Sequence, residues 1–212
     1  MIAAISLMRR RPDLGLAHFQ RHWLDPHGVM TAELPGVRSY IQSHCLDTAG
    51  TNALARELAI DGFPQLWFDD IAARSIAYAS PRIAECNVDS EQFVGAVSRL
   101  VTAPEVVVER STMDAAKVVI LGIGPPDPGW SERLHTRVLA VQGLSSYVRH
   151  TLLEQAAAPA SKIPELNVQV AGIAEVAFEN EATLVANAGV FAGADADAGR
   201  TAVYRVRDYK LV

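Results

Sequence analysis

Two histidines near the N-terminus are candidates for proton-transfer chemistry. His22 and His27 bracket the segment Trp23-Leu24-Asp25-Pro26. Residues with this spacing do not share one face of a regular helix, but Pro26 interrupts the helix, so both imidazoles can point to one place. Imidazole titrates near neutral pH and suits proton transfer to and from carbon. The alternative is that either ring is a structural histidine held by hydrogen bonds.

The same region carries only a weak metal-binding pattern. His18 and His22 have the i, i+4 spacing of two ligands on a helix, but no third ligand belongs to the motif. Cys45 and Cys86 form no metal motif and are expected to be free thiols. We therefore predict no metal site.

Two predicted strands, 37–45 and 63–69, carry further polar and aromatic side chains. Side chains alternate between the two faces of a strand, and the apolar members are expected to pack against helices. One face of the sheet is then lined by Tyr40, Gln42, His44, Gln65, Trp67 and Asp69. Aromatic walls with an imidazole, amides and a carboxylate are typical of a small-molecule pocket. A solvent-exposed sheet face is the alternative.

These residues lie within a predicted β-α-β-β-α-β unit. The expected elements are a strand at 2–8, a helix from Pro12 to Pro26, strands at 37–45 and 63–69, a helix at 71–79, a helix after Ser90 and a strand at 105–109. The helix after Ser90 is inferred from the helical spacing of Phe93, Val97 and Leu100. A polar connection is expected at 48–60.

The second half of the chain repeats this pattern. Pro35-Gly36-Val37-Arg38-Ser39-Tyr40 is echoed by Gln142-Gly143-Leu144-Ser145-Ser146-Tyr147. The expected elements of this half are strands at 118–123, 144–152, 168–178 and 201–209, helices at 130–141 and 182–188, and a loop at 192–199. The join is expected at 111–115. We predict an α+β fold of two ferredoxin-like repeats, at 1–111 and 112–212, arranged as a dimeric α/β-barrel.

Such sheets can enclose a space within one chain, as a pseudo-dimer, or between two chains, as a homodimer. The second repeat is shorter between Asp127 and Tyr147 than the first is between Asp13 and Tyr40. The missing stretch would hold the counterparts of His22 and His27. We therefore predict one working pocket, built on the first sheet, with the second sheet mainly as a lid and structural partner. A contribution of Tyr147 and Arg149 across the enclosed space is left open.

Composition excludes several classes of function. The net charge is −5, which does not favour a nucleic-acid partner. No apolar run is long enough to span a membrane, and the N-terminus lacks the order of a secretory signal, so a cytoplasmic protein is expected. The glycine-rich nucleotide motifs and the G-x-S-x-G elbow are missing from the sequence, and no cofactor is predicted.

Five segments, taken in order, resemble the EthD family. They are Phe19-Gln20-Arg21-His22-Trp23, His27-Gly28, Pro35 to His44, Asp61-Gly62-Phe63 and Leu66 to Asp70. The resemblance implies the dimeric α/β-barrel fold, and relatives that include methylmuconolactone isomerases and polyketide-modifying proteins. It also implies catalysis without a metal or organic cofactor, by His22, His27, Tyr40 and His44. The cysteines used by the methylmuconolactone isomerases have no convincing counterpart at Cys45 or Cys86.

The function predicted from these observations is cofactor-independent proton transfer on a cyclic or aromatic oxygenated metabolite, as in an isomerase, cyclase or dehydratase. His22 or His27 is the expected base, Tyr40 the donor to an enolate oxygen, and His44 the group that orients or returns the proton. The predicted substrate contacts are Trp23, Gln42, Gln65, Trp67 and Asp69. The alternatives are a non-catalytic carrier of a hydrophobic intermediate and a cofactor-free monooxygenase.

Overall fold

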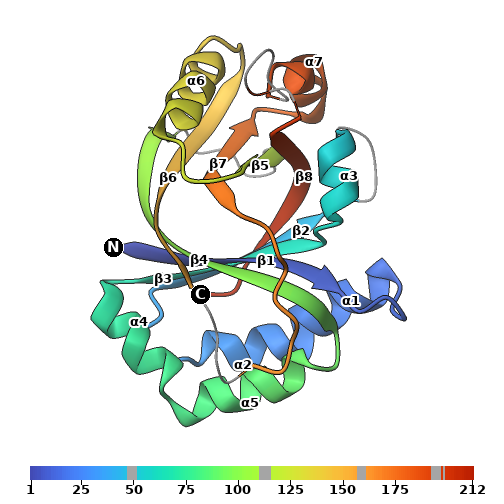
Figure 1. Ribbon diagram of the computed structural model, residues 1–212, viewed down its shortest axis with the longest axis vertical. Helices are drawn as coiled ribbons and strands as arrows, with labels where there is room; N and C mark the ends of the chain where they lie inside the picture. Colours follow the sequence, from blue (N-terminus) through green and yellow to red (C-terminus); the bar gives the residue numbers. More distant parts are fainter. Residues whose placement is uncertain (47–51, 110–115, 157–160, 192–196, 198) are drawn as a thin grey trace.

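Eight β-strands of the chain close into one barrel, and the helices pack outside it (Figure 1). The structure is a computed structural model that describes residues 1–46, 52–109, 116–156, 161–191, 197 and 199–212. The strands follow the order β1-β3-β2-β8-β5-β7-β6-β4 around the barrel, and each is antiparallel to its neighbours. The predicted α+β class and the barrel are therefore confirmed.

The elements alternate along both halves of the chain. The first half contains β1 (Ile2–Arg10), α1 (Leu16–His22), the π-helical turn η1 (Trp23–His27), α2 (Gly28–Ala32), β2 (Ser39–Cys45), α3 (Ala53–Leu58), β3 (Gly62–Phe68), α4 (Ile71–Tyr78), α5 (Pro81–Ser90) and β4 (Val94–Glu109). The second half contains β5 (Ala116–Ile123), α6 (Pro128–Leu139), β6 (Leu144–Ala156), β7 (Val170–Phe178), α7 (Glu181–Phe191) and β8 (Thr201–Lys210).

The two halves have the same strand order. The first-half strands lie in the order β4-β1-β3-β2, and the second-half strands in the order β8-β5-β7-β6. They join where β2 pairs with β8 and β4 pairs with β6, so the barrel closes within one chain. Helices α2, α4 and α5 cover the outer face of the first-half strands, and α6 and α7 cover that of the second half (Figure 1).

The structure corrects the end of the first half. The segment after Ser90 is the strand β4 rather than a helix, and the helix is α5, which lies before it. Ser80 caps α5 by accepting a hydrogen bond from Ile83 N, and Pro81 occupies its first turn, which is a helix-start pattern that our prediction overlooked. The valines of β4 favour a strand, and its length lets it pair with β1 and then with β6.

The remaining predicted strands and helices occur close to their expected positions. The connection expected at 48–60 contains α3, whose first turn is capped by Asn52. The join expected at 111–115 and most of the loop expected at 192–199 lie outside the described residues. Within the described part of the chain, no helix is both long and apolar enough to cross a membrane.

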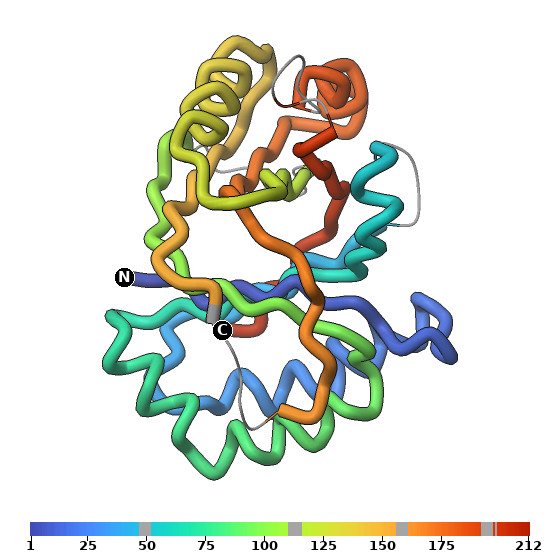
Figure 2. The backbone as a smooth tube through the Cα atoms, in the orientation of Figure 1, coloured from blue at the N-terminus to red at the C-terminus, as the bar shows by residue number. Residues whose placement is uncertain are grey.

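The segment before β7 ties the second half to the first. Residues 163–166 run alongside β4, in a segment that starts near α5 and rises toward β7, as the backbone tube shows (Figure 2). Val97 N donates to Pro164 O at 3.0 Å, and Leu166 N donates to Val97 O at 2.9 Å. Ile163 and Leu166 are buried there, so this segment extends the core of the first half.

The register of β2 against β3 shows that the residues predicted to line one face of the sheet lie on two opposite faces. Tyr40 lies opposite Leu66, and Ile41 lies opposite Gln65. Directly opposed residues of antiparallel strands point to the same side of the sheet. Tyr40, Gln42 and His44 therefore face the helices, whereas Gln65 and Trp67 face the barrel interior. Both faces of β2 mix polar and apolar residues, so the alternation in sequence did not decide which one is covered.

Candidate functional site

Three ionisable side chains meet between the helices and the sheet of the first half. The turn η1 and the start of α2 place His22 and His27 next to Asp89 of α5. His22 Nε2 lies 3.0 Å from Asp89 Oδ1, and His27 Nδ1 lies 2.9 Å from Asp89 Oδ2. Phe93 contacts both rings, and His27 and Asp89 are buried. The two predicted histidines therefore share one carboxylate.

Asp89 determines which nitrogen of His27 is available. The hydrogen bond from His27, supported by His22, holds the pKa of the Asp89 carboxyl below its usual range. A carboxylate only accepts hydrogen bonds, so Nδ1 of His27 carries the proton. In the neutral ring, Nε2 then has a lone pair, and the Thr31 hydroxyl lies 3.1 Å from it. This is the arrangement of a base oriented by a carboxylate.

A second set of hydrogen bonds holds Tyr40. His44 Nε2 lies 2.8 Å from Gln42 Oε1, and Gln42 Nε2 donates to the Tyr40 hydroxyl at 2.8 Å and to Trp23 O at 2.8 Å. The His44 ring stacks on Trp23 with centroids 4.2 Å apart and planes at 8°. Because the Tyr40 oxygen accepts from Gln42, its own proton is available to another acceptor.

Burial sets the charge state of two of these groups. It raises the pKa of Tyr40 above its ordinary value, so the phenol is a proton-bearing donor at neutral pH. It also lowers the pKa of His44 to about 4, so this imidazole is neutral at pH 7. His44 therefore positions Gln42 and does not serve as a cation.

His27 and Tyr40 border one cavity, which we call the helix-layer cavity. Its volume is about 80 Å³, and its lining includes Trp23, His27, Thr31, Tyr40, Tyr78, Cys86 and Arg99. Thr31 also lies close enough to interact with the Tyr40 hydroxyl. The cavity thus has a candidate base and a candidate acid among largely apolar walls.

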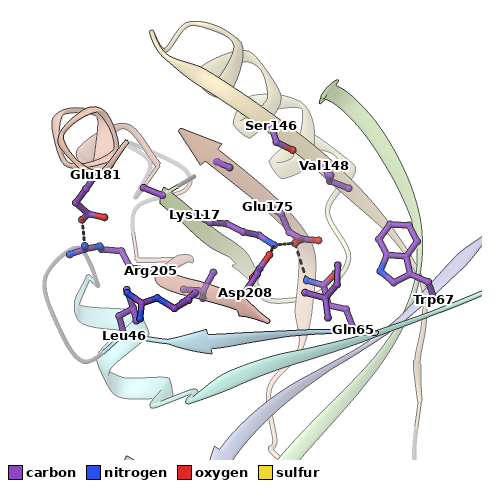
Figure 3. Close-up of a pocket in the computed structure, with 15 residues that line it drawn as sticks. Leu46, Gln65, Trp67, Lys117, Ser146, Val148, Glu175, Glu181, Arg205 and Asp208 are labelled. Carbon is purple, nitrogen blue, oxygen red and sulfur yellow. Dashed lines mark hydrogen bonds and ion pairs between the residues drawn. The ribbon is translucent and has the colours of Figure 1, made fainter. Parts of the chain in front are cut away.

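A larger cavity lies inside the barrel, and we call it the barrel cavity. Its volume is about 630 Å³, and both halves of the chain line it (Figure 3). Gln65 and Trp67 of β3, two of the predicted substrate contacts, face it. Asp69 lies in neither cavity, since it forms an exposed ion pair with Arg38.

The second half contributes the charged groups of the barrel cavity. Lys117 Nζ lies 2.5 Å from Glu175 Oε2 and 2.5 Å from Asp208 Oδ2. Glu175 also accepts from Gln65 Nε2 at 2.9 Å and lies 2.7 Å from His150 Nε2. Burial alone would raise the pKa of Glu175, but Lys117 and His150 outweigh it and hold that pKa well below its usual range. The second sheet is therefore more than the lid that we predicted.

Sequence reasoning missed several of these groups. Lys117 and Glu175 are lone charges within the apolar strands β5 and β7, and an isolated charge in a buried strand indicates a partner. Asp89 is one of several polar residues of α5, and Thr31 is a single threonine in the short helix α2, so nothing in their spacing marks them. Among the described residues, no three His, Cys, Asp or Glu side chains converge as metal ligands.

The comparisons with known proteins agree with this architecture. Residues 11–96 match the family model described as the EthD domain. The structure is similar to that of an anthrone oxidase-like protein, with a TM-score of 0.62 and 10% identity, covering 99% of this chain and 92% of the other. It is also similar to a putative monooxygenase from Lactobacillus acidophilus, with a TM-score of 0.52 and 10% identity, covering 98% and 93%.

A third similar structure is a putative monooxygenase from Fusobacterium nucleatum, with a TM-score of 0.55 and 10% identity, covering 100% of this chain and 98% of the other. At these identities the likeness concerns the fold alone. Comparison with curated protein sequences gives no match. All of the helix-layer residues that interact with Asp89 lie within the segment 11–96.

Proposed function

Because residues 11–96 of this chain match the EthD domain model, we propose that the protein is an enzyme acting on a small oxygenated metabolite by proton transfer at carbon. The observation that carries this proposal is the meeting of an Asp89-oriented His27 and the Tyr40 phenol at one buried cavity. A base and a hydrogen-bond donor on one cavity are the two groups that enolisation requires.

The proposed base is Nε2 of His27. A substrate that enters the cavity replaces the Thr31 hydroxyl at this nitrogen and places an acidic C–H there. The proton moves to Nε2, and Asp89 stabilises the imidazolium that forms. His22 donates to the other oxygen of Asp89 and so acts as a positioning residue. Of the two histidines that the sequence left open, the geometry favours His27 as the base.

The proposed acid group is Tyr40, which would donate to the developing enolate oxygen. Gln42 donates to the Tyr40 oxygen, and this polarises the phenol and strengthens it as a donor. His44 holds Gln42 in turn. Return of the proton from His27 to another carbon gives an isomerase, and loss of a leaving group gives a lyase.

The size of the helix-layer cavity limits the substrate. Its volume of about 80 Å³ is smaller than the ~150 Å³ cavity that holds benzene. The present state therefore admits a small ring only in part, or the reacting end of a larger molecule. Complete entry of a larger ring requires α2 and α5 to move apart.

The second candidate is cofactor-free oxygenation. The anthrone oxidase-like and monooxygenase neighbours of similar fold favour it. The same base would form the same carbanion, which dioxygen would then attack in place of a proton. The third possibility is a carrier, which would bind the metabolite without converting it and would need no catalytic role for His27 or Tyr40.

A small cyclic carbon acid can test these possibilities. We choose α-angelica lactone, a five-membered ring whose isomerisation to the conjugated five-membered ring of β-angelica lactone is followed by ultraviolet absorbance. We expect the protein to accelerate this isomerisation under nitrogen. His27→Asn and Tyr40→Phe are each expected to lower kcat by about 100-fold or more. Arg38→Ala, which alters only an exposed ion pair, should retain the wild-type rate.

Three results are distinguishable. Isomerisation that is equally fast in all variants would contradict the proposed site. Product formation in air but not under nitrogen, with consumption of dioxygen, would favour the oxygenase. Saturable binding of the lactone without any turnover would favour the carrier.

We further propose that the chain is a tandem of two ferredoxin-like units, at 1–111 and 112–212. The equal strand order of the two halves supports this proposal. Superposition of β1–β4 on β5–β8 in an experimental structure tests it, and a different path of the connections would contradict it.

A further inference from the structure

The barrel interior is divided into a filled end and a hollow end. The filled end is packed with apolar side chains that include Ile5, Leu7, Phe63, Val119 and Tyr204. The hollow end is the barrel cavity, whose volume of about 630 Å³ lies within the range of small-molecule sites. Nothing in the chemistry proposed for the helix-layer cavity uses this space.

Gln65 leaves an acceptor unused in the barrel cavity. The residue is 1% exposed, and its Nε2 donates to Glu175 Oε2 at 2.9 Å. Because Glu175 is a carboxylate held as an anion by Lys117, only the NH₂ end of the amide can face it. The carbonyl oxygen Oε1 has no hydrogen-bond partner among the described residues. A buried acceptor without a partner is unfavourable, and a hydrogen bond from a ligand donor would remove that cost.

Trp67 leaves a donor unused in the same cavity. Its Nε1 is buried and has no hydrogen-bond partner within the described part of the chain. Gln65 and Trp67 are two positions apart on β3 and share the face that lines the cavity (Figure 3). The residues that carry this acceptor and this donor are therefore about 7 Å apart along the backbone of one strand. The Trp67 ring also supplies an aromatic wall.

The charges of the cavity do not select an ion. Lys117 is paired with both Glu175 and Asp208, and Arg205 is paired with Glu181. Arg207 also lines the cavity, so three cationic and three anionic side chains balance, and no excess of either charge is left for a ligand to neutralise. The other walls include Ile41, Val148 and Ala177, which are apolar. Paired charges and apolar walls favour a ligand without net charge.

We propose that the barrel cavity is a second binding site, which takes a neutral ring compound with a hydroxyl or N–H donor for Gln65 Oε1 and an oxygen acceptor for Trp67 Nε1. The site is separate from the helix-layer cavity, since it lies on the opposite face of the first-half sheet. Its ligand is therefore bound independently of Tyr40 and His27.

Two coumarins probe this site with the full-length protein. The first, 7-hydroxycoumarin, has a hydroxyl donor at one end and a lactone carbonyl at the other, and it is neutral at pH 6. The second, 7-methoxycoumarin, lacks the donor. We expect saturable binding by calorimetry at pH 6, with the hydroxy compound bound about fivefold more tightly, as one hydrogen bond predicts.

The variants assign the two contacts. In Gln65→Leu, the difference between the two coumarins should disappear. In Trp67→Phe, which keeps the aromatic wall, both coumarins should bind about fivefold more weakly. Trp130→Phe is the matched control: it makes the same change at a buried indole of α6 that donates to Thr201, and it should leave both affinities unchanged.

Some results would overturn the proposal. One is the absence of saturable binding of 7-hydroxycoumarin, and another is equal affinity of the two coumarins for the wild-type protein. The last is binding that is weakened by Tyr40→Phe and unchanged by Trp67→Phe. The last result would place the ligand in the helix-layer cavity. The comparison of the two coumarins uses only the wild-type protein, so it decides the question even if a variant does not fold.

Discussion

Two histidines of this protein each lie between a carboxylate and a threonine hydroxyl, one among the helices and one inside the barrel. The helix-layer triplet is Asp89, His27 and Thr31, and the barrel triplet is Glu175, His150 and Thr102. The distances are similar, at 2.9 and 3.1 Å in the first and 2.7 and 3.0 Å in the second. The surroundings of the two carboxylates are different.

The helix-layer carboxylate, Asp89, accepts from two imidazoles, His22 and His27. The barrel carboxylate, Glu175, accepts from an imidazole, an amide and the Lys117 ammonium. An ammonium keeps its charge over the whole neutral range, whereas an imidazole gains or loses a proton there. Glu175 is therefore held by a lasting positive charge as well as by an imidazole, whereas the partners of Asp89 named here are imidazoles.

Cavity size follows the opposite order. The groups suited to proton transfer border about 80 Å³, and the fixed charges border about 630 Å³. In this fold, the larger cavity and the groups suited to proton transfer therefore lie in different places. The larger cavity is therefore evidence for binding, and its size alone does not identify the reactive site.

The largest expected effect comes from removing the fixed cation. Lys117→Met leaves the buried Glu175 without its ammonium, and we expect a loss of about 3–5 kcal/mol in the free energy of unfolding. The matched change at the other carboxylate, His22→Gln, should cost only about 1 kcal/mol, since Asp89 keeps His27. Urea denaturation measures both. Equal losses would remove the distinction between the two triplets.

The next effect is a dependence of stability on pH. The folded-state pKa of His44, about 4, lies below its ordinary value of 6.5, so the unfolded chain binds more protons between these values. The contribution of neutral His44 is complete above about pH 6.5 and is lost as the pH falls toward 4, by roughly 3 kcal/mol. Denaturation at several pH values should show this slope in the wild-type protein and a flatter one in His44→Gln.

The barrel triplet sharpens this test. Because Lys117 and His150 keep the pKa of Glu175 well below its usual range despite burial, Glu175 remains ionised in the folded protein above pH 5. It should therefore add little slope between pH 5 and 7. An unchanged slope in His44→Gln would mean that another group titrates over this range.

A smaller effect concerns the packing that holds the helix layer. A Cβ added at Gly62 would overlap the ring of Trp23, which stacks on His44. Gly62→Ala is therefore expected to cost about 2 kcal/mol in the free energy of unfolding. Gly189→Ala in α7 is the control, since its Cβ would meet nothing within 4 Å. Thermal denaturation should show a slight stabilisation for the control, because alanine favours a helix.

The smallest effect should come from an exposed ion pair. Arg38 and Asp69 are both more than half exposed, and Arg38→Ala should cost less than about 1 kcal/mol. Urea denaturation alongside Lys117→Met shows whether loss of a cation matters only where the partner is buried. A loss comparable to that of Lys117→Met would contradict this view.

Much of the fold could be predicted from the sequence because most strands carry apolar runs with clear ends. The exception was β4, where Phe93, Val97 and Leu100 fit helical spacing as well as a strand. The helix-layer residues His22, His27 and Tyr40 were found from their types and spacing, but they face the helices rather than the barrel interior. Which face of β2 points into the barrel depends on the layer that packs against each face, and this packing is set by the tertiary structure.

The carboxylate partners were beyond the sequence for a similar reason. Asp89 is 62 positions from His27, and only the packing of α5 against η1 brings the two together. Lys117 and Glu175 showed a detectable signal as lone charges in apolar strands, but their pairing required the β5–β7 register. Local patterns identify reactive residue types, and long-range packing decides which of them meet.

Closure of the barrel by one chain has a consequence for symmetry. In a barrel made of two identical subunits, every residue occurs twice around a two-fold axis, and two inward-pointing ammonium groups would share one interior. Here the β2–β8 and β4–β6 ladders join two unlike halves, so Lys117 occurs once. The same ladders are intramolecular, so dilution does not open the barrel. The Lys117 ammonium with its two carboxylates is an arrangement that a symmetric barrel of this size would have to hold in duplicate.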